Sequence, residues 1–111
     1  MNWNNLDSAE KLNSLHNESK ENKIIIFKHS TRCSISSMAL SRFERNFKEE
    51  ELKDAKAYFL DLITFRNLSN QIADTYNVRH ESPQVLVISN GECIYNASHS
   101  GISYNEIIDQ L

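Results

Sequence analysis

The sequence has few of the residues that interrupt helices and strands, with two glycines and one proline among its 111 residues. Its apolar runs are also short, as in Ile24–Phe27 and Val85–Ile88. A membrane-spanning helix needs about 20 consecutive apolar residues, and an export signal needs a basic start before an apolar stretch. Neither pattern is present, so we expect a cytoplasmic protein without a membrane partner.

An excess of basic residues is missing as well. There are 12 lysines and arginines against 15 aspartates and glutamates, and the basic residues are scattered along the chain. A protein that binds nucleic acid usually gathers its basic residues on one face, so no nucleic-acid partner is expected. The length is that of one domain, which we expect to span residues 1–111.

Cysteine is too rare for a disulfide framework or a four-ligand zinc site, because the chain has only Cys33 and Cys93, which lie 60 positions apart. Free thiols are therefore expected in a reducing compartment. The four histidines show no metal-ligand spacing, so no metal is expected: they are His16, His29, His80 and His99. His29 and His80 are interpreted as solvent-facing residues or loop hydrogen-bonders rather than general bases.

Periodicity defines the order of the elements. A capping box of Asp7 and Glu10 predicts a helix to about Ser19, and a second one of Ser103 and Glu106 predicts the last helix. Between them the pattern predicts a strand over 23–30, a helix over 33–49 with Ile35 and Met38 on its apolar face, a strand over 55–62, a helix over 65–76, and a hairpin over 84–97 around Asn90-Gly91.

This order, with two strands joined by a helix and then a connecting helix, a hairpin and a last helix, is similar to that of thioredoxin-like proteins. We therefore predict an α/β fold with a central four-stranded mixed sheet flanked by helices, and one extra helix at the N-terminus. Cys33 follows the first core strand, and Pro83 precedes the hairpin. Thioredoxin-like proteins have their nucleophilic cysteine and their cis-proline at these two places, which predicts a cis bond before Pro83.

Cys33 is the candidate nucleophile. The thiolate is the attacking species in disulfide exchange, and an ordinary cysteine is only slightly ionised at neutral pH. The positive end of the following helix, the charge of Arg32 and a hydrogen bond from the Ser36 hydroxyl are all expected to favour the thiolate. The alternative, a buried and inert cysteine, is disfavoured because residues 30–34 are polar.

Ser36 stands where thioredoxin has its second cysteine, so Cys33 cannot close a local disulfide and one-thiol chemistry follows. Counting back from the Asn90-Gly91 turn places Cys93 opposite Ile88, far from Cys33, and Gln84 opposite Ala97. The same count places His99 at the Pro83 end of the hairpin. We expect substrate contacts from Ser34, Ser82, Pro83 and His99; the alternative for His99 is a cap of the Gly101 turn.

The segments 28–36, 80–84 and 98–100 together resemble the monothiol bacilliredoxin family over nearly the whole chain. The family motif reads Cys-Pro-Ile-Ser, and this chain matches it at Cys33, Ile35 and Ser36 but has Ser34 in place of the proline. The resemblance implies a thiol–disulfide oxidoreductase that removes bacillithiol from S-thiolated cytosolic proteins. Bacillithiol is then a low-molecular-weight co-substrate, and no bound cofactor is expected.

Two other functions stay open. A redox sensor or adaptor, modified at Cys33 but without turnover, fits the same thiol. Iron–sulfur cluster binding in the manner of monothiol glutaredoxins favours a glycine beside the cysteine, and Ser34-Ile35 offers none.

Overall fold

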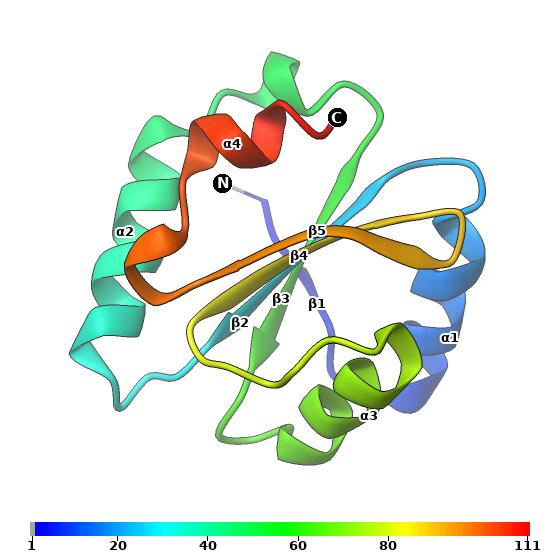
Figure 1. Cartoon of the computed structure of the whole chain (residues 1–111), viewed down its shortest axis with the longest axis horizontal. Coiled ribbons are helices and arrows are strands. Elements are labelled where there is room, and N and C mark those ends of the chain that lie inside the picture. The colour runs from blue at the N-terminus through cyan, green and yellow to red at the C-terminus, as the bar shows by residue number, and fades with distance from the viewer. Residues whose placement is uncertain (1) are drawn as a thin grey trace.

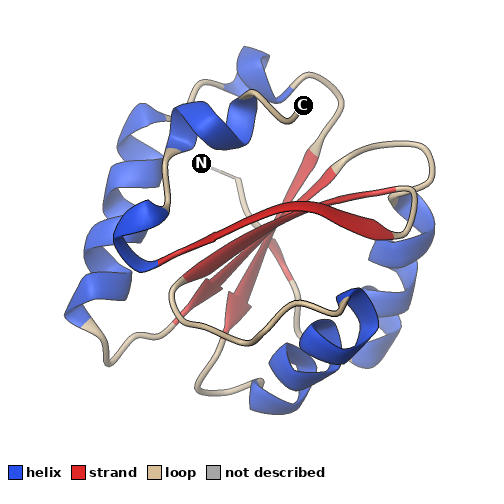
Figure 2. Ribbon diagram, in the orientation of Figure 1, coloured by secondary structure: helices blue, strands red, loops and turns tan. Residues whose placement is uncertain are grey.

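The computed structural model describes residues 2–111 and confirms an α/β fold (Figures 1 and 2). In chain order the elements are β1 (Asn4–Asn5), α1 (Ala9–Glu18), β2 (Ile24–His29), α2 (Ser34–Asn46), the 3₁₀ turn η1 (Glu49–Leu52), β3 (Lys56–Asp61), α3 (Arg66–Tyr76), β4 (Gln84–Ser89), β5 (Glu92–Ser98), the 3₁₀ turn η2 (His99–Gly101) and α4 (Tyr104–Ile108). No helix within residues 2–111 is long and apolar enough to cross a membrane.

The sheet has five strands in the order β1-β3-β2-β4-β5, rather than the four expected. β2 is parallel to β3 and antiparallel to β4, and β5 completes the hairpin. The additional strand is β1, whose two asparagines pair in parallel with Tyr58 and Phe59 at the edge of the sheet. Two polar residues carry no alternating pattern, so only the pairing with β3 reveals this strand.

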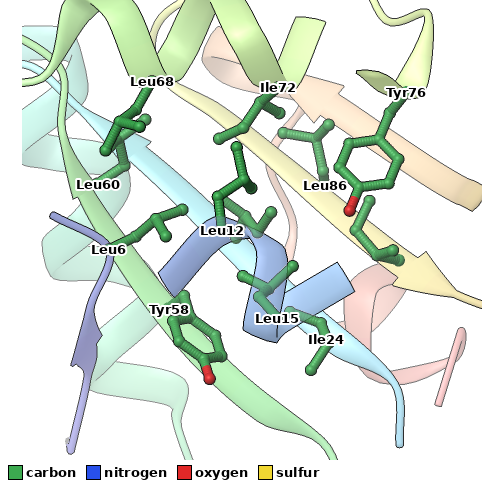
Figure 3. Close-up of a cluster of buried hydrophobic side chains, with 12 residues drawn as sticks. Leu6, Leu12, Leu15, Ile24, Tyr58, Leu60, Leu68, Ile72, Tyr76 and Leu86 are labelled. Atoms are coloured by element: carbon green, nitrogen blue, oxygen red, sulfur yellow. The ribbon is translucent and has the colours of Figure 1, made fainter. Parts of the chain in front are cut away.

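Two apolar layers cover the two faces of the sheet. Figure 1 shows α1 and α3 on one face and α2 and α4 on the other. β2 supplies both layers, because successive residues of a strand point to opposite faces. The layer beneath α1 and α3, shown in Figure 3, consists of Leu6, Leu12, Leu15, Ile24, Ile26, Tyr58, Leu60, Leu68, Ile72, Tyr76, Leu86 and Ile88. The other layer consists of Ile25, Phe27, Ala39, Phe43, Ala57, Val85, Val87, Ile102, Tyr104 and Ile107.

The element ends differ from the sequence prediction by a few residues. Helix α1 is capped by Ser8, whose Oγ accepts the Lys11 N–H at 3.1 Å. The predicted cap Asp7 instead pairs with the Lys11 ammonium at 2.9 Å. Helix α2 begins at Ser34, with Cys33 as its N-cap, and ends at Asn46 rather than near residue 49.

The hairpin register is confirmed beside the turn and shifted beyond it. Asn90 and Gly91 both have positive φ, at 52° and 76°, as a two-residue type I′ turn requires. Cys93 pairs with Ile88 as predicted, but Gln84 pairs with Ser98 and not with Ala97. A bulge causes the shift: Val87 pairs with Tyr95, so one additional residue of β5 lies between the two pairs.

Candidate functional site

Cys33 lies between the end of β2 and the first turn of α2. Its backbone is extended, and its N–H donates to the Ser30 carbonyl at 3.2 Å, which closes a tight turn. Its carbonyl accepts the Ser37 N–H at 3.1 Å, so the residue caps the helix with its backbone. The side chain is partly exposed and makes no capping hydrogen bond. The sulfur is therefore open to a reactant at the positive end of a helix of 13 residues.

Arg32 and Ser34 flank this thiol, and both are exposed. Within residues 2–111 neither side chain has an ion pair or a hydrogen bond that fixes its position. Arg32 therefore contributes a solvated cation next to the nucleophile, while Ser34 forms the first exposed residue of α2.

Ser36 does not make the hydrogen bond to Cys33 that the sequence suggested. It is fully buried, and its Oγ accepts the Ser30 N–H at 3.0 Å and lies 2.7 Å from Nδ1 of His29. The third helical residue of α2 faces the sheet, where the end of β2 offers these two partners. Ser36 thus links the helix to the strand that precedes the nucleophile.

Pro83 lies at the same end of the sheet as Cys33. The Ser82–Pro83 bond is cis, as predicted, and Pro83 leads directly into β4. Gln84, the first residue of β4, pairs with Lys28 near the end of β2, one strand away from the Cys33 loop. Figure 1 shows the loop before β4 and the loop before α2 at this common end. The Oγ of Ser82 is buried without a hydrogen-bond partner among residues 2–111.

His99 joins this site through its backbone. Its N–H donates to the Pro83 carbonyl at 3.0 Å, and its φ of 54° marks the turn from β5 into η2. The imidazole is exposed, with Nδ1 3.8 Å from Oε2 of Glu81. His99 also lines a groove of about 290 Å³ between η2 and the first turns of α2, together with Ile35, Met38, Ala39, Arg42 and Ser100.

The sequence pattern placed Ile35 and Met38 on the apolar face of α2, but the structure leaves both side chains exposed. Their side chains are 54% and 67% exposed, the two highest values among the large exposed apolar side chains of residues 2–111. Helical spacing places them on one stripe, but the sheet does not cover the first turns of the helix at that stripe. The helical spacing of Ile35 and Met38 was therefore the sequence signal for the groove, but it was interpreted as a face that packs on the sheet.

Sequence reasoning missed a buried polar cluster on the other face of the sheet. Lys28 is fully buried, and its ammonium makes a hydrogen bond of 3.4 Å to the Ser69 carbonyl. Burial lowers the pKa of Lys28 to about 8. Gln84 is also buried; its Nε2 donates to the Arg79 carbonyl at 3.0 Å, while its Oε1 has no partner within residues 2–111. The cluster lies beneath the loop that carries Pro83.

His29 and His80 were interpreted as solvent-facing residues or as hydrogen-bonding residues of loops. Both side chains lie within hydrogen-bonding distance of a serine hydroxyl, but His29 is buried and does not face solvent. Only 6% of His29 is exposed, and burial lowers its pKa, against the opposing effect of Asp61 and Glu44. His80 lies with Nδ1 2.9 Å from the Ser69 hydroxyl, and burial together with nearby Lys28 lowers its pKa. Within residues 2–111 no three His, Cys, Asp or Glu side chains gather at one place.

Cys93 lies in a different environment from Cys33. It is half-buried in β5, its Sγ donates to the Tyr95 carbonyl at 3.3 Å, and burial raises the pKa of its thiol. Both cysteines are free. A thiol that is hydrogen-bonded and held protonated is a poor nucleophile, so Cys33 is the better candidate for exchange chemistry.

Known proteins with similar structures are thioredoxin-fold proteins. A structure described as a candidate oxidoreductase with a thioredoxin fold has 31% identity and a TM-score of 0.80, over 95% of this chain and 89% of that one. The Malassezia sympodialis thioredoxin Mala s 13 has 13% identity and a TM-score of 0.77, over 98% and 90%. Thioredoxin from Trypanosoma brucei brucei has 9% identity and a TM-score of 0.75, over 98% and 87%. These likenesses confirm the thioredoxin fold.

The family model of monothiol bacilliredoxin BrxC matches residues 4–107, which includes every element of the site. Family and fold together support a thiol oxidoreductase, and the geometry provides a partly exposed thiol at a helix N-terminus beside a cis-proline. The chain belongs to the monothiol bacilliredoxin family.

Proposed function

We propose that this protein removes bacillithiol from mixed disulfides on S-thiolated cytosolic proteins, with Cys33 as the single reacting thiol. The observation that carries the proposal is the placement of Cys33: it is partly exposed at the N-terminus of α2, at the sheet end that also holds Pro83. Ser36, three residues on, has no thiol and is fully buried. The choice of bacillithiol as the small thiol rests on family membership.

The reaction needs two exchanges. In the first, the Cys33 thiolate attacks the bacillithiol sulfur of the mixed disulfide; a new S–S bond joins Cys33 to bacillithiol, and the target cysteine leaves as a thiolate. In the second, the thiolate of another low-molecular-weight thiol attacks the bacillithiol sulfur. This releases a small-molecule disulfide and restores the Cys33 thiolate. Each exchange breaks one S–S bond and forms one, so no separate oxidant or reductant is required.

Several residues assist these steps. Arg32 and the N-terminus of α2 place positive charge beside the Cys33 sulfur, where the attacking thiolate carries its negative charge. Ser34 follows Cys33 in the chain, and Ser82, Pro83 and His99 lie at the same end of the sheet; we expect these four residues to contact the small thiol and an extended target segment. Bacillithiol serves as a co-substrate, and the chemistry requires no resident cofactor.

Transfer of the small thiol tests the proposal. The protein is incubated with a purified target that carries one bacillithiol mixed disulfide, and intact-mass spectrometry follows both proteins. We expect the target to lose the mass of bacillithiol and Cys33 to gain it, and added free bacillithiol to restore the unmodified enzyme. If folded protein takes up no bacillithiol from the target, the proposal is wrong and the sensor or adaptor reading replaces it.

A further inference from the structure

The Ser36 hydroxyl is the contact through which the nucleophile loop is held to the sheet. Its oxygen accepts the Ser30 N–H at 3.0 Å and lies 2.7 Å from Nδ1 of His29. Because this oxygen already accepts one hydrogen bond, its own proton is available to a second partner. The simplest assignment is that Ser36 donates to Nδ1 and that Nε2 carries the proton of a neutral ring.

His29 is well placed to hold this hydroxyl. Its ring packs against the ring of Phe59 with centroids 5.6 Å apart, and its carbonyl accepts the Leu62 N–H at 2.9 Å. Burial lowers the pKa of His29 and outweighs the three opposing influences, which are the charges of Asp61 of β3 and Glu44 of α2 and a hydrogen bond with the Ser36 backbone. At pH 7 the ring is therefore neutral, and Nδ1 can accept.

Cys33 offers the hydroxyl a competing acceptor. Cys33 is the N-cap of α2 and Ser36 is its third helical residue, and side chains at these two positions face each other across the first turn. In this structure Cys33 has no side-chain capping bond, and the Ser36 oxygen lies within hydrogen-bonding distance of Nδ1 of His29 instead. The choice of acceptor decides whether the reactive sulfur receives a hydrogen bond from this hydroxyl.

We propose that His29 is a positioning residue for the nucleophile: by accepting the Ser36 hydroxyl proton, it keeps that hydroxyl turned away from the sulfur of Cys33. The thiolate then receives no hydrogen bond from this hydroxyl and retains more of its nucleophilicity. The inference rests on the proposed function only in that Cys33 is the reacting thiol.

The rate of alkylation of Cys33 by iodoacetamide, measured from pH 5 to pH 10 by mass spectrometry, tests this inference without bacillithiol or a target protein. His29→Phe keeps an aromatic ring against Phe59 but removes Nδ1, so the Ser36 hydroxyl turns to the sulfur. A hydrogen bond to the thiolate is expected to lower the midpoint of the pH–rate curve by about one unit. With a Brønsted slope of ~0.4–0.5, it also reduces the plateau rate about threefold.

Four further variants separate this role from simple loosening of the loop. His29→Asn retains an acceptor close to the position of Nδ1 and is expected to restore the wild-type curve. The double variant His29→Phe/Ser36→Ala is expected to match Ser36→Ala alone, because the hydroxyl that His29 directs is gone. His16→Phe is the matched control, since it removes a ring nitrogen that is hydrogen-bonded to Tyr76 in another part of the molecule, and it should leave the curve unchanged.

Two results would overturn the inference. One is that the changes which His29→Phe and Ser36→Ala cause in the pH–rate curve add up in the double variant. Independent, purely structural roles of the two residues would produce this result. The other comes from ¹⁵N NMR of the wild-type ring at pH 7: the proton is expected on Nε2, and finding it on Nδ1 contradicts the proposed hydrogen bond whether or not any variant folds. Because neither readout involves bacillithiol, failure of the transfer experiment leaves this test intact.

Discussion

At the scale of single residues, the least expected feature is the buried Lys28. A fully buried ammonium usually has a carboxylate partner, but Lys28 has a single long hydrogen bond to the Ser69 carbonyl and no salt bridge within residues 2–111. Gln84 lies directly opposite on β4, with an unpartnered oxygen. The buried charge of Lys28 beneath the Pro83 loop is therefore expected to lower the free energy of unfolding by a measurable amount.

We predict that Lys28→Met stabilises the protein at neutral pH. The pKa of Lys28 falls from 10.5 to about 8 on folding. This difference corresponds to about 3 kcal/mol, and losing the Ser69 bond costs about 1, which leaves a gain of about 2 kcal/mol. The unfolded chain binds the proton more tightly, so wild-type stability rises from pH 8 to pH 10.5, and the advantage of the variant disappears over that range.

Urea unfolding of both proteins at pH 7 and pH 10 measures this difference. Lys11→Met is the control, because that lysine is exposed and its ion pair with Asp7 lies on the surface. A stability difference for Lys28→Met that stays constant between the two pH values would show that the ammonium is not the cause.

At the scale of elements, the β4–β5 hairpin determines how far Cys93 lies from the Cys33 end of the sheet, and so whether the two thiols can form a disulfide. Cys93 pairs with Ile88, which is five residues along β4 from Pro83. At about 3.3 Å per residue this separates Cys93 from the active end of the sheet by roughly 16 Å, whereas a disulfide needs Cα atoms within about 7 Å. The bulge in β5 lies between Cys93 and that end, so it shifts the far register but leaves this argument unchanged.

We therefore predict that Cys93→Ser retains full transfer of bacillithiol when a free small thiol is present, and that Cys33→Ser abolishes transfer. The same intact-mass assay measures both variants, and circular dichroism verifies that each is folded. Peptide mapping of oxidised monomer provides the opposing outcome: a Cys33–Cys93 disulfide in high yield would disprove both the hairpin register and the one-thiol mechanism.

At the scale of the whole molecule, the N-terminal segment is part of the fold. Strand β1 extends the sheet, and Trp3 stacks on Phe43 with ring centroids 5.6 Å apart. The same indole lies 5.8 Å from the ring of Phe27 and 5.9 Å from that of Phe59, and its Nε1 donates to Glu44 at 3.0 Å. Trp3, just before β1, thus shares one aromatic cluster with residues from β2, β3 and α2.

We predict that Trp3→Ala lowers the free energy of unfolding by about 2 kcal/mol, because the half-buried indole loses its aromatic contacts and its hydrogen bond. Thermal unfolding followed by circular dichroism measures the change. Ile94→Ala, at a side chain that is 44% exposed, is the control and is expected to change stability by less than about 0.5 kcal/mol. Equal effects of the two variants would mean that the N-terminal segment does not contribute to the core.

The sequence by itself determined the features that depend on neighbouring residues. Strand and helix periodicity, the Asn90-Gly91 turn and the polar segment before Cys33 are local, so the element order and the place of the nucleophile followed from them. The pairing of Cys93 with Ile88 followed as well, because it lies within a few residues of the turn.

Only the tertiary structure decided which partner each side chain meets. Strand periodicity assigns Lys28 to a face but does not say that α3 buries it, and helical spacing cannot show that the sheet leaves Ile35 and Met38 uncovered. The partner of Ser36 depends in the same way on where β2 ends relative to the first turn of α2. Burial and hydrogen bonding are set by groups from other elements, and the local sequence carries no information about their distance.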